Sequence, residues 1–186
     1  MKKSRTFDPW VGQHYDGGIG GKRVLILGES HYGDKGDETS EFTRFIIENH
    51  GIKKGKHRIY ARIKVLIAGE DLSDPRRREF WQKVAFYNYI QTAIARPRIR
   101  PTPEQWEAAT DPFLDTVSEL SPEFVVVLGV ELGKHLPPLP GGVVACNLKH
   151  PSSWGFSYDC EREKLKAAGL SVQGHQILTD RASRSV

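Results

Sequence analysis

The sequence predicts an α/β protein in which three layers (α/β/α) enclose a central, largely parallel sheet of four strands. Four short apolar runs, each about as long as a typical strand, are spread along the chain. Uninterrupted runs of this kind are typical of strands that are buried on both faces. Segments with helical spacing separate the runs, and strands that alternate with helices form parallel sheets.

Apolar runs indicate the strands, and capping residues and prolines indicate the helices. The strands are expected at residues 24–28, 84–90, 124–129 and 143–148. The helices are expected at residues 39–51, 58–68, 75–83, 102–120 and 159–168. Thr102-Pro103-Glu104-Gln105 fits a capping box, which begins a helix, and Pro112 permits an interruption further along it.

The length of 186 residues predicts one domain, which we place at residues 23–170. Residues 1–22 are rich in glycine and aromatic residues, and we expect an irregular lead-in that packs on the domain. Residues 171–186 are expected to form a polar tail. No apolar run is long enough to span a bilayer, and the basic start leads into no signal region. We therefore expect a cytoplasmic monomer without membrane contact.

The cysteine count and the charge of the chain limit the kinds of binding site that we expect. The two cysteines, Cys146 and Cys160, are too few for a disulfide scaffold or a four-cysteine metal site, and the seven histidines show no metal-ligand spacing. We therefore expect no metal and no cofactor. The net charge is +4, and the basic residues cluster at residues 53–64, 76–78 and 96–100. Basic clusters attract phosphate backbones, although solvated helix faces produce the same pattern.

Polar side chains lie near the carboxyl ends of three of the expected strands. They are Glu29 in the loop after the first strand, Asn88 in the second and His150 just after the fourth. Ligands bind at the carboxyl ends of strands in open α/β sheets, and Pro151 restricts the backbone at His150. A side-chain amide has a donor and an acceptor side by side, as the edge of a nucleobase does. Taken singly, each residue also fits an ordinary structural role.

Together these segments resemble the uracil-DNA glycosylase superfamily, over residues 23 to about 168. The resemblance rests on the order and spacing of several segments: Gly28-Glu29-Ser30-His31-Tyr32, Asn88, residues 96–104, 112–114 and 122–129, and the loop at His150. The middle of the chain is similar to the bacterial and archaeal branches, but the chain lacks the four cysteines of members with an iron–sulfur cluster. The resemblance implies a uracil-DNA glycosylase-like fold.

The resemblance also implies an activity. The protein would bind DNA, double- or single-stranded, and hydrolyse the N-glycosidic bond of a flipped, deaminated base such as uracil, releasing the free nucleobase. Glu29 would stabilise the sugar cation or orient a water, and His150 would donate a hydrogen bond to the departing base. The implied base-binding residues are Asn88, Tyr32, Phe42 (or Phe45) and Ser30. The implied DNA-binding residues are Ser152, Ser153 and Trp154, with Trp154 as a wedge beside the duplex.

The first of these segments, residues 28–32, departs from the family pattern. This departure leaves two alternatives to the activity open. Ser30 stands where some members have an aspartate or asparagine, and His31 where many have a proline. Because a serine cannot act as a carboxylate base, one alternative is a nucleobase-binding module that has lost hydrolysis. The other alternative is a hydrolase that acts on free nucleosides or nucleotides.

Overall fold

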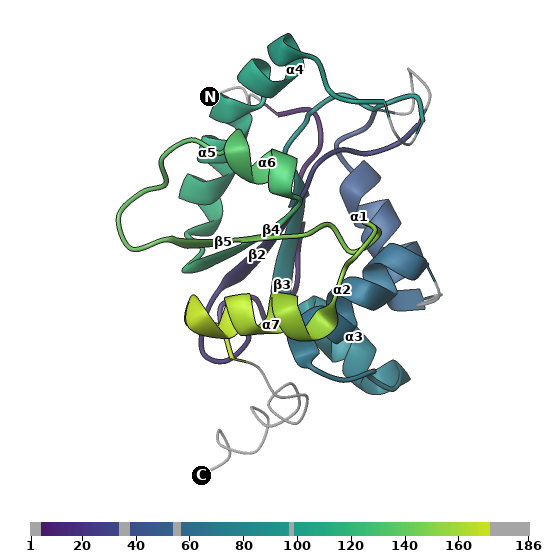
Figure 1. Ribbon diagram of the computed structural model, residues 1–186. Helices are drawn as coiled ribbons and strands as arrows, with labels where there is room; N and C mark the ends of the chain where they lie inside the picture. The colour runs from purple at the N-terminus through teal and green to yellow at the C-terminus, as the bar shows by residue number, and fades with distance from the viewer. Residues whose placement is uncertain (1–4, 34–37, 54–56, 97–98, 172–186) are drawn as a thin grey trace.

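The computed structural model describes residues 5–33, 38–53, 57–96 and 99–171 (Figure 1). The strands are β1 (Trp10–Val11), β2 (Val24–Gly28), β3 (Val84–Asn88), β4 (Phe124–Leu128) and β5 (Val144–Leu148). The helices are α1 (Phe42–Ile46), the π-helix η1 (Ile47–Lys53), α2 (Arg58–Ala68), α3 (Asp74–Gln82), α4 (Pro103–Ala108), α5 (Thr110–Leu120), α6 (Val130–Lys134) and α7 (Tyr158–Ala167).

The strands form one sheet in the order β1-β3-β2-β4-β5. All neighbouring pairs are parallel except β1 and β3, which are antiparallel. The predicted α/β class and the largely parallel sheet are therefore confirmed, but the predicted count of four strands is wrong, because the described residues form a sheet of five. The fifth strand, β1, lies within the segment that was predicted to be irregular, and only tertiary pairing of Trp10 with Phe86 and of Val11 with Ala85 defines it.

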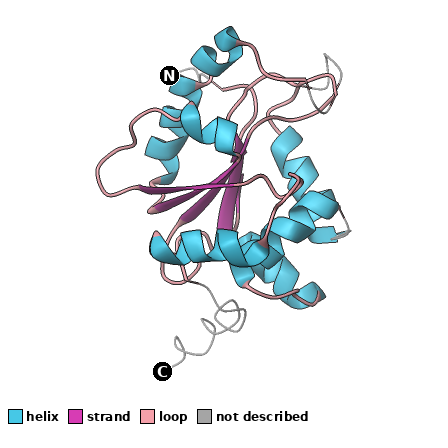
Figure 2. Cartoon of the chain, viewed as in Figure 1, coloured by secondary structure: helices cyan, strands magenta, loops and turns pink. Residues whose placement is uncertain are grey.

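Helices cover both faces of the sheet (Figure 2). Alternate residues of each central strand point to opposite faces, so each face has its own core. On one face, strand residues such as Ile26 and Val126 pack against apolar residues of η1, α2, α3 and α7. On the other face, Leu27 and Val127 pack against apolar residues of α4, α5 and α6. This alternation also decides the face on which a side chain at a strand end lies.

Helix boundaries agree with the predictions where local signals are strong. α2 spans the predicted residues, and α4 begins with the predicted capping box, in which Thr102 Oγ1 accepts from the Gln105 N–H and Gln105 Oε1 accepts from the Thr102 N–H. The predicted helix 102–120 is two helices, and it breaks at Ala109 rather than at Pro112. Proline suits the first turn of α5, where its missing N–H would have no helical partner.

Three further features differ from the predictions. The predicted helix 39–51 is α1 continued by η1, without a side-chain cap at its start. Helix α6 was not predicted. β5 was predicted as a buried strand, but it is the outer strand of the sheet and Val144, Ala145 and Asn147 are exposed. Of the predicted tail, only Ser171 is described, and residues 172–186 lie outside the described residues.

Candidate functional site

The carboxyl ends of β2, β3, β4 and β5 lie along one edge of the sheet because these strands are parallel. Gly28 at the end of β2 pairs with Asn88 at the end of β3. His150 follows the end of β5, which β4 separates from β2. Neighbouring strands are about 4.8 Å apart, so the ends of β3 and β5 are separated by ~14 Å. Asn88 and His150 therefore mark the two sides of this edge.

Asn88 presents a buried side-chain amide at this edge. The residue is 4% exposed, and its side chain lies over Gly28, where an added Cβ would be 2.2 Å from Asn88 Oδ1. A side chain at the end of β2 would therefore displace the Asn88 amide from this position. No described residue forms a hydrogen bond with the Asn88 side-chain amide, so its donor and acceptor are available to a ligand. The amide shares the sheet face of Phe86, two residues earlier in β3.

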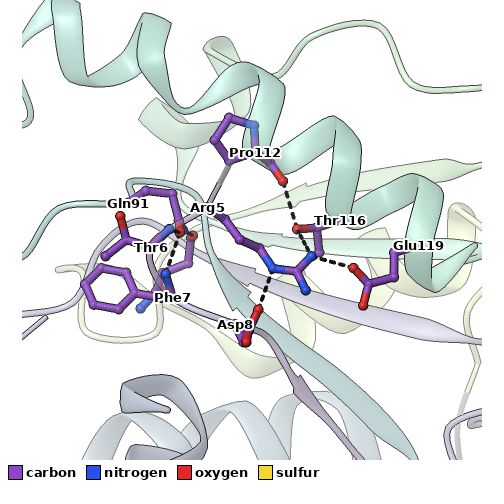
Figure 3. A network of polar contacts seen from close by, with 9 residues as sticks. Arg5, Thr6, Phe7, Asp8, Gln91, Pro112, Thr116 and Glu119 are labelled. Atoms are coloured by element: carbon purple, nitrogen blue, oxygen red, sulfur yellow. Dashed lines mark hydrogen bonds and ion pairs between the residues drawn. The ribbon is translucent and has the colours of Figure 1, made fainter. Parts of the chain in front are cut away.

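Gln91 ties the end of β3 to the N-terminal segment (Figure 3). Its Nε2 donates to the Asn88 carbonyl oxygen at 2.8 Å, and its Oε1 accepts from the backbone N–H groups of Thr6 and Phe7 at 3.1 and 2.9 Å. Figure 3 also shows Arg5 bound to Asp8 and to side chains of α5. The N-terminal segment is therefore part of the structure that positions Asn88.

Glu29 is half-buried directly after β2. Burial raises the pKa of its carboxyl group, Arg100 and His135 lower it, and Glu131 raises it. These charged neighbours belong to α6, to the residue that follows it and to the loop before α4, and none belongs to the loop that carries His150. The structure thus places Glu29 at the predicted edge, in an electrostatic environment provided by the α6 side of the sheet.

Ser30 and Tyr32 lie together beside Glu29. Tyr32 is 51% exposed, and the Ser30 side chain is close enough to affect its pKa. Burial and the Glu29 carboxylate raise the pKa of Tyr32, whereas Arg100 and the Ser30 side chain lower it. A half-exposed phenol at this position can form one wall of a pocket, as the resemblance implied.

Phe42 is held in an aromatic cluster with Phe7 and His31. Its ring centroid lies 4.9 Å from that of His31, edge to face, and 6.0 Å from that of Phe7. His31 is 4% exposed, its Nε2 lies 2.9 Å from Thr43 Oγ1, and burial lowers its pKa to about 4. His31 is therefore a neutral core residue. Phe45, the alternative stacking residue, is 56% exposed.

His150 lies in the His150 loop, residues 149–156, which follows β5. Ser152 contacts its Nδ1 twice, through the backbone N–H at 3.3 Å and through Oγ at 2.7 Å. Because a backbone N–H can only donate, Nδ1 is the acceptor and the proton of the neutral ring is on Nε2. Burial lowers the pKa of His150, which keeps the ring neutral. The loop therefore presents an Nε2–H donor.

Two helices hold the His150 loop. Arg62 of α2 donates to the Pro151 carbonyl oxygen, and Glu161 of α7 accepts from the Lys149 N–H at 3.0 Å. Within the loop, the Ser153 N–H donates to the His150 carbonyl oxygen at 2.8 Å. Glu161 is 1% exposed and is also paired with Lys164. The loop is thus fixed from both sides.

An open groove of about 440 Å³ separates the His150 loop from α2, and we call it the α2 groove. Its lining residues are Arg58, Arg62, Ser152, Ser153, Trp154, Gly155, Phe156 and Tyr158. The three predicted DNA-binding residues, Ser152, Ser153 and Trp154, are all exposed here, and the Trp154 side chain is 99% exposed. The structure therefore brings these three together on one surface.

Sequence reasoning missed Gln91, Glu161 and the specific place of Arg62. Arg62 was only one member of a basic cluster, and the helical spacing of Arg58 and Arg62 was the signal that they share a face. Gln91 and Glu161 act on backbone atoms of distant segments, and no local pattern indicates such contacts.

None of the described helices is long and apolar enough to cross a membrane. Within the described ranges, no group of three or more histidine, cysteine, aspartate or glutamate side chains could hold a metal ion. No protein-family model matches the chain, and no curated protein matches it either.

Proposed function

We propose that this protein is a glycosylase of the uracil-DNA glycosylase type, which binds DNA and hydrolyses the N-glycosidic bond of an extruded, deaminated base. The observation that carries the proposal is the hydrogen bonding of His150. Ser152 occupies Nδ1, so a neutral ring offers its Nε2–H at the ligand-binding edge of the sheet. A donor in this state suits a base whose carbonyl oxygen gains negative charge.

The proposed reaction breaks the bond between C1′ of the sugar and the base nitrogen, and the electron pair leaves with the base. Nε2–H of His150 donates to a base carbonyl oxygen and stabilises the developing charge without giving up its proton. A water oxygen forms the new bond to C1′, and the Glu29 carboxylate accepts its proton. The departing base is then protonated from solvent, which balances the reaction.

Asn88 is the proposed reader of the base. Its amide is buried, and among the described residues it has no hydrogen-bond partner, so a base edge that offers a carbonyl and an N–H can occupy both its donor and its acceptor. Tyr32 and Ser30 supply a wall of the same pocket, and the cluster of Phe42 and His31 supports it.

The test is an excision assay on oligonucleotides that carry uracil, hypoxanthine or xanthine. Abasic product is expected from at least one of them. Asn88→Ala and His150→Ala are expected to reduce the rate by about a hundredfold or more, because each removes a group that contacts the base. His57→Ala removes an exposed imidazole at the start of α2 and serves as the matched control. Failure to release any of the three bases contradicts hydrolysis.

A second candidate is a nucleobase-binding module without hydrolysis. The observation that favours it is the environment of residues 28–32: Ser30 lies close to Tyr32, and the charged neighbours of Glu29 lie on the α6 side. Glu29→Gln separates the two candidates. It abolishes excision if Glu29 is the base, and it leaves oligonucleotide binding unchanged in both.

A further inference from the structure

We propose that the α2 groove is a subsite for one nucleotide of an unpaired strand, with Arg58 and Arg62 on the phosphate and Trp154 stacked on the base. This inference deepens the proposed function and rests on it for nucleic acid as the ligand class. It adds a preference for single-stranded over paired nucleic acid, and it assigns two arginines that the resemblance did not.

The first observation is the positive charge of the α2 groove. Arg58 and Arg62 are four residues apart and share one face of α2. Neither guanidinium forms an ion pair with any described residue, and none of the groove's lining residues is acidic. Arg62 donates to the Pro151 carbonyl oxygen, which fixes its side chain beside the loop. Two arginines without a carboxylate partner make this groove an anion site, and phosphate matches the guanidinium donors.

The second step is the exposure of Trp154. The other three tryptophans of the chain, Trp10, Trp81 and Trp106, are at most 8% exposed, whereas Trp154 is 99% exposed. The backbone of the His150 loop is held by its own turn and by two helices, and the Trp154 ring projects from it into solvent. Stacking of bases on exposed aromatic rings is a main source of affinity in single-strand binding proteins.

The third step is the size and shape of the groove. A volume of about 440 Å³ lies in the range of sites that hold one small molecule. A nucleotide is a ligand of that size, whereas a double helix is a far larger one. Bases within a duplex are also stacked on their neighbours, and only splayed bases are free to stack on a protein side chain. The groove therefore favours an unpaired strand.

The test uses a fluorescein-labelled oligothymidylate, alone and annealed to its complement, and needs no damaged base. Anisotropy is expected to show binding of the single strand at least about tenfold tighter than the duplex, and Trp154→Leu to weaken it at least about fivefold. Arg58→Gln is expected to reduce the slope of log affinity against log salt by about 0.7, since it removes one phosphate contact. Arg78→Gln, an exposed arginine on α3, is the matched control and should leave affinity unchanged.

Trp154 also supplies an independent readout. Quenching of its emission by the oligothymidylate is expected, and Trp154→Leu should abolish it because the remaining tryptophans are buried. Arg62 is not substituted, because its contact with Pro151 also holds the His150 loop. Equal affinity for duplex and single strand, or unchanged affinity in Trp154→Leu, overturns the inference.

The outcomes separate the subsite from the proposed hydrolysis. Binding of the single strand at the α2 groove without excision of any base supports the subsite and contradicts the hydrolysis. Excision from duplex substrates without oligothymidylate binding overturns the subsite and leaves the hydrolysis standing. If the protein neither binds oligothymidylate nor excises a base, both the subsite and the hydrolysis are contradicted.

Discussion

At the scale of single residues, the three histidines of the described edge differ because their surroundings differ. His31 is enclosed by Phe7 and Phe42, His150 is bonded to Ser152, and His135 stacks on Trp106 with ring centroids 4.1 Å apart. Only His150 combines a fixed acceptor nitrogen with a place in a loop after a strand. Its identity as a histidine was visible in the sequence, but the state of its ring was not.

The pH dependence of excision follows from the state of His150. Protonation of Nδ1 removes the acceptor that the Ser152 N–H uses and with it a contact that orients the ring, and Glu29 accepts a proton only while ionised, so both groups lose their role as pH falls. Burial lowers the pKa of His150 below its ordinary value of about 6.5, whereas it raises the pKa of Glu29 above about 4.5. We expect the rate to stay level from neutral pH down through about 6.5 and to fall only below it. Single-turnover rates across this range check the prediction, and a midpoint above 6.5 contradicts it.

His31 makes stability depend on pH. Its pKa is lowered from an ordinary 6.5 to about 4, so between these values the unfolded chain binds more protons than the folded one. This contribution to stability is complete above the unfolded pKa and is lost as pH falls toward the folded pKa, to a total of about 3 kcal/mol. Denaturant unfolding at neutral and mildly acidic pH measures it. His31→Gln should flatten the dependence, and an unchanged slope in that variant contradicts the assignment.

At the scale of elements, Gln91 joins two segments that are far apart in the chain. Gln91→Ala leaves the buried Phe7 N–H and the exposed Thr6 N–H without their acceptor, and we expect a loss of about 1–3 kcal/mol of unfolding free energy. Because Gln91 also binds the Asn88 carbonyl oxygen, base recognition should weaken as well. Gln13→Ala, an exposed glutamine, is the control for denaturant unfolding. Equal stability of the two variants would show that the bridge contributes little.

Elements with strong local signals were predictable, and elements defined by tertiary contacts were not. The capping box at Thr102 and the buried valines of β4 contain their own physical reasons, so their positions were predicted closely. β1 has two residues and exists because it pairs with β3. α6 has five residues, which is too short for a periodic pattern, and Gly133 weakens its helix propensity further.

The site was predictable to the level of the sheet edge. Parallel strands place Glu29, Asn88 and His150 on that edge, and this much followed from the order of apolar runs. The charged groups around Glu29 could not be predicted from the sequence, because Arg100 and His135 come from segments whose packing only the fold determines. The position of the Asn88 amide could not be predicted either, since it depends on the absence of a side chain at Gly28.

At the scale of the whole molecule, the segment before residue 23 contributes side chains to the core. Phe7 is fully buried, and Trp10 is buried with its Nε1–H bonded to the Trp81 carbonyl oxygen at 2.8 Å. Loss of one such aromatic residue from a core costs about 3–5 kcal/mol, and typical domains are stable by only about 5–15 kcal/mol.

Removal of residues 1–22 should therefore unfold the protein or leave it without a cooperative transition. Circular dichroism during heating checks this, with the full chain as the reference. A cooperative transition at the same temperature in the shortened chain contradicts the role of the N-terminal segment and supports a domain that starts at residue 23.

The way in which the His150 loop is held has a consequence for engineering. Its fixed points are backbone atoms of Lys149, His150 and Pro151, bound to Glu161, Ser153 and Arg62. The side chains of Ser153 and Trp154 take no part in these bonds and face solvent. The tip of the loop is thus a position where new recognition residues can be grafted onto an intact scaffold, and a library of variants at these two positions would alter ligand choice without loss of folded protein.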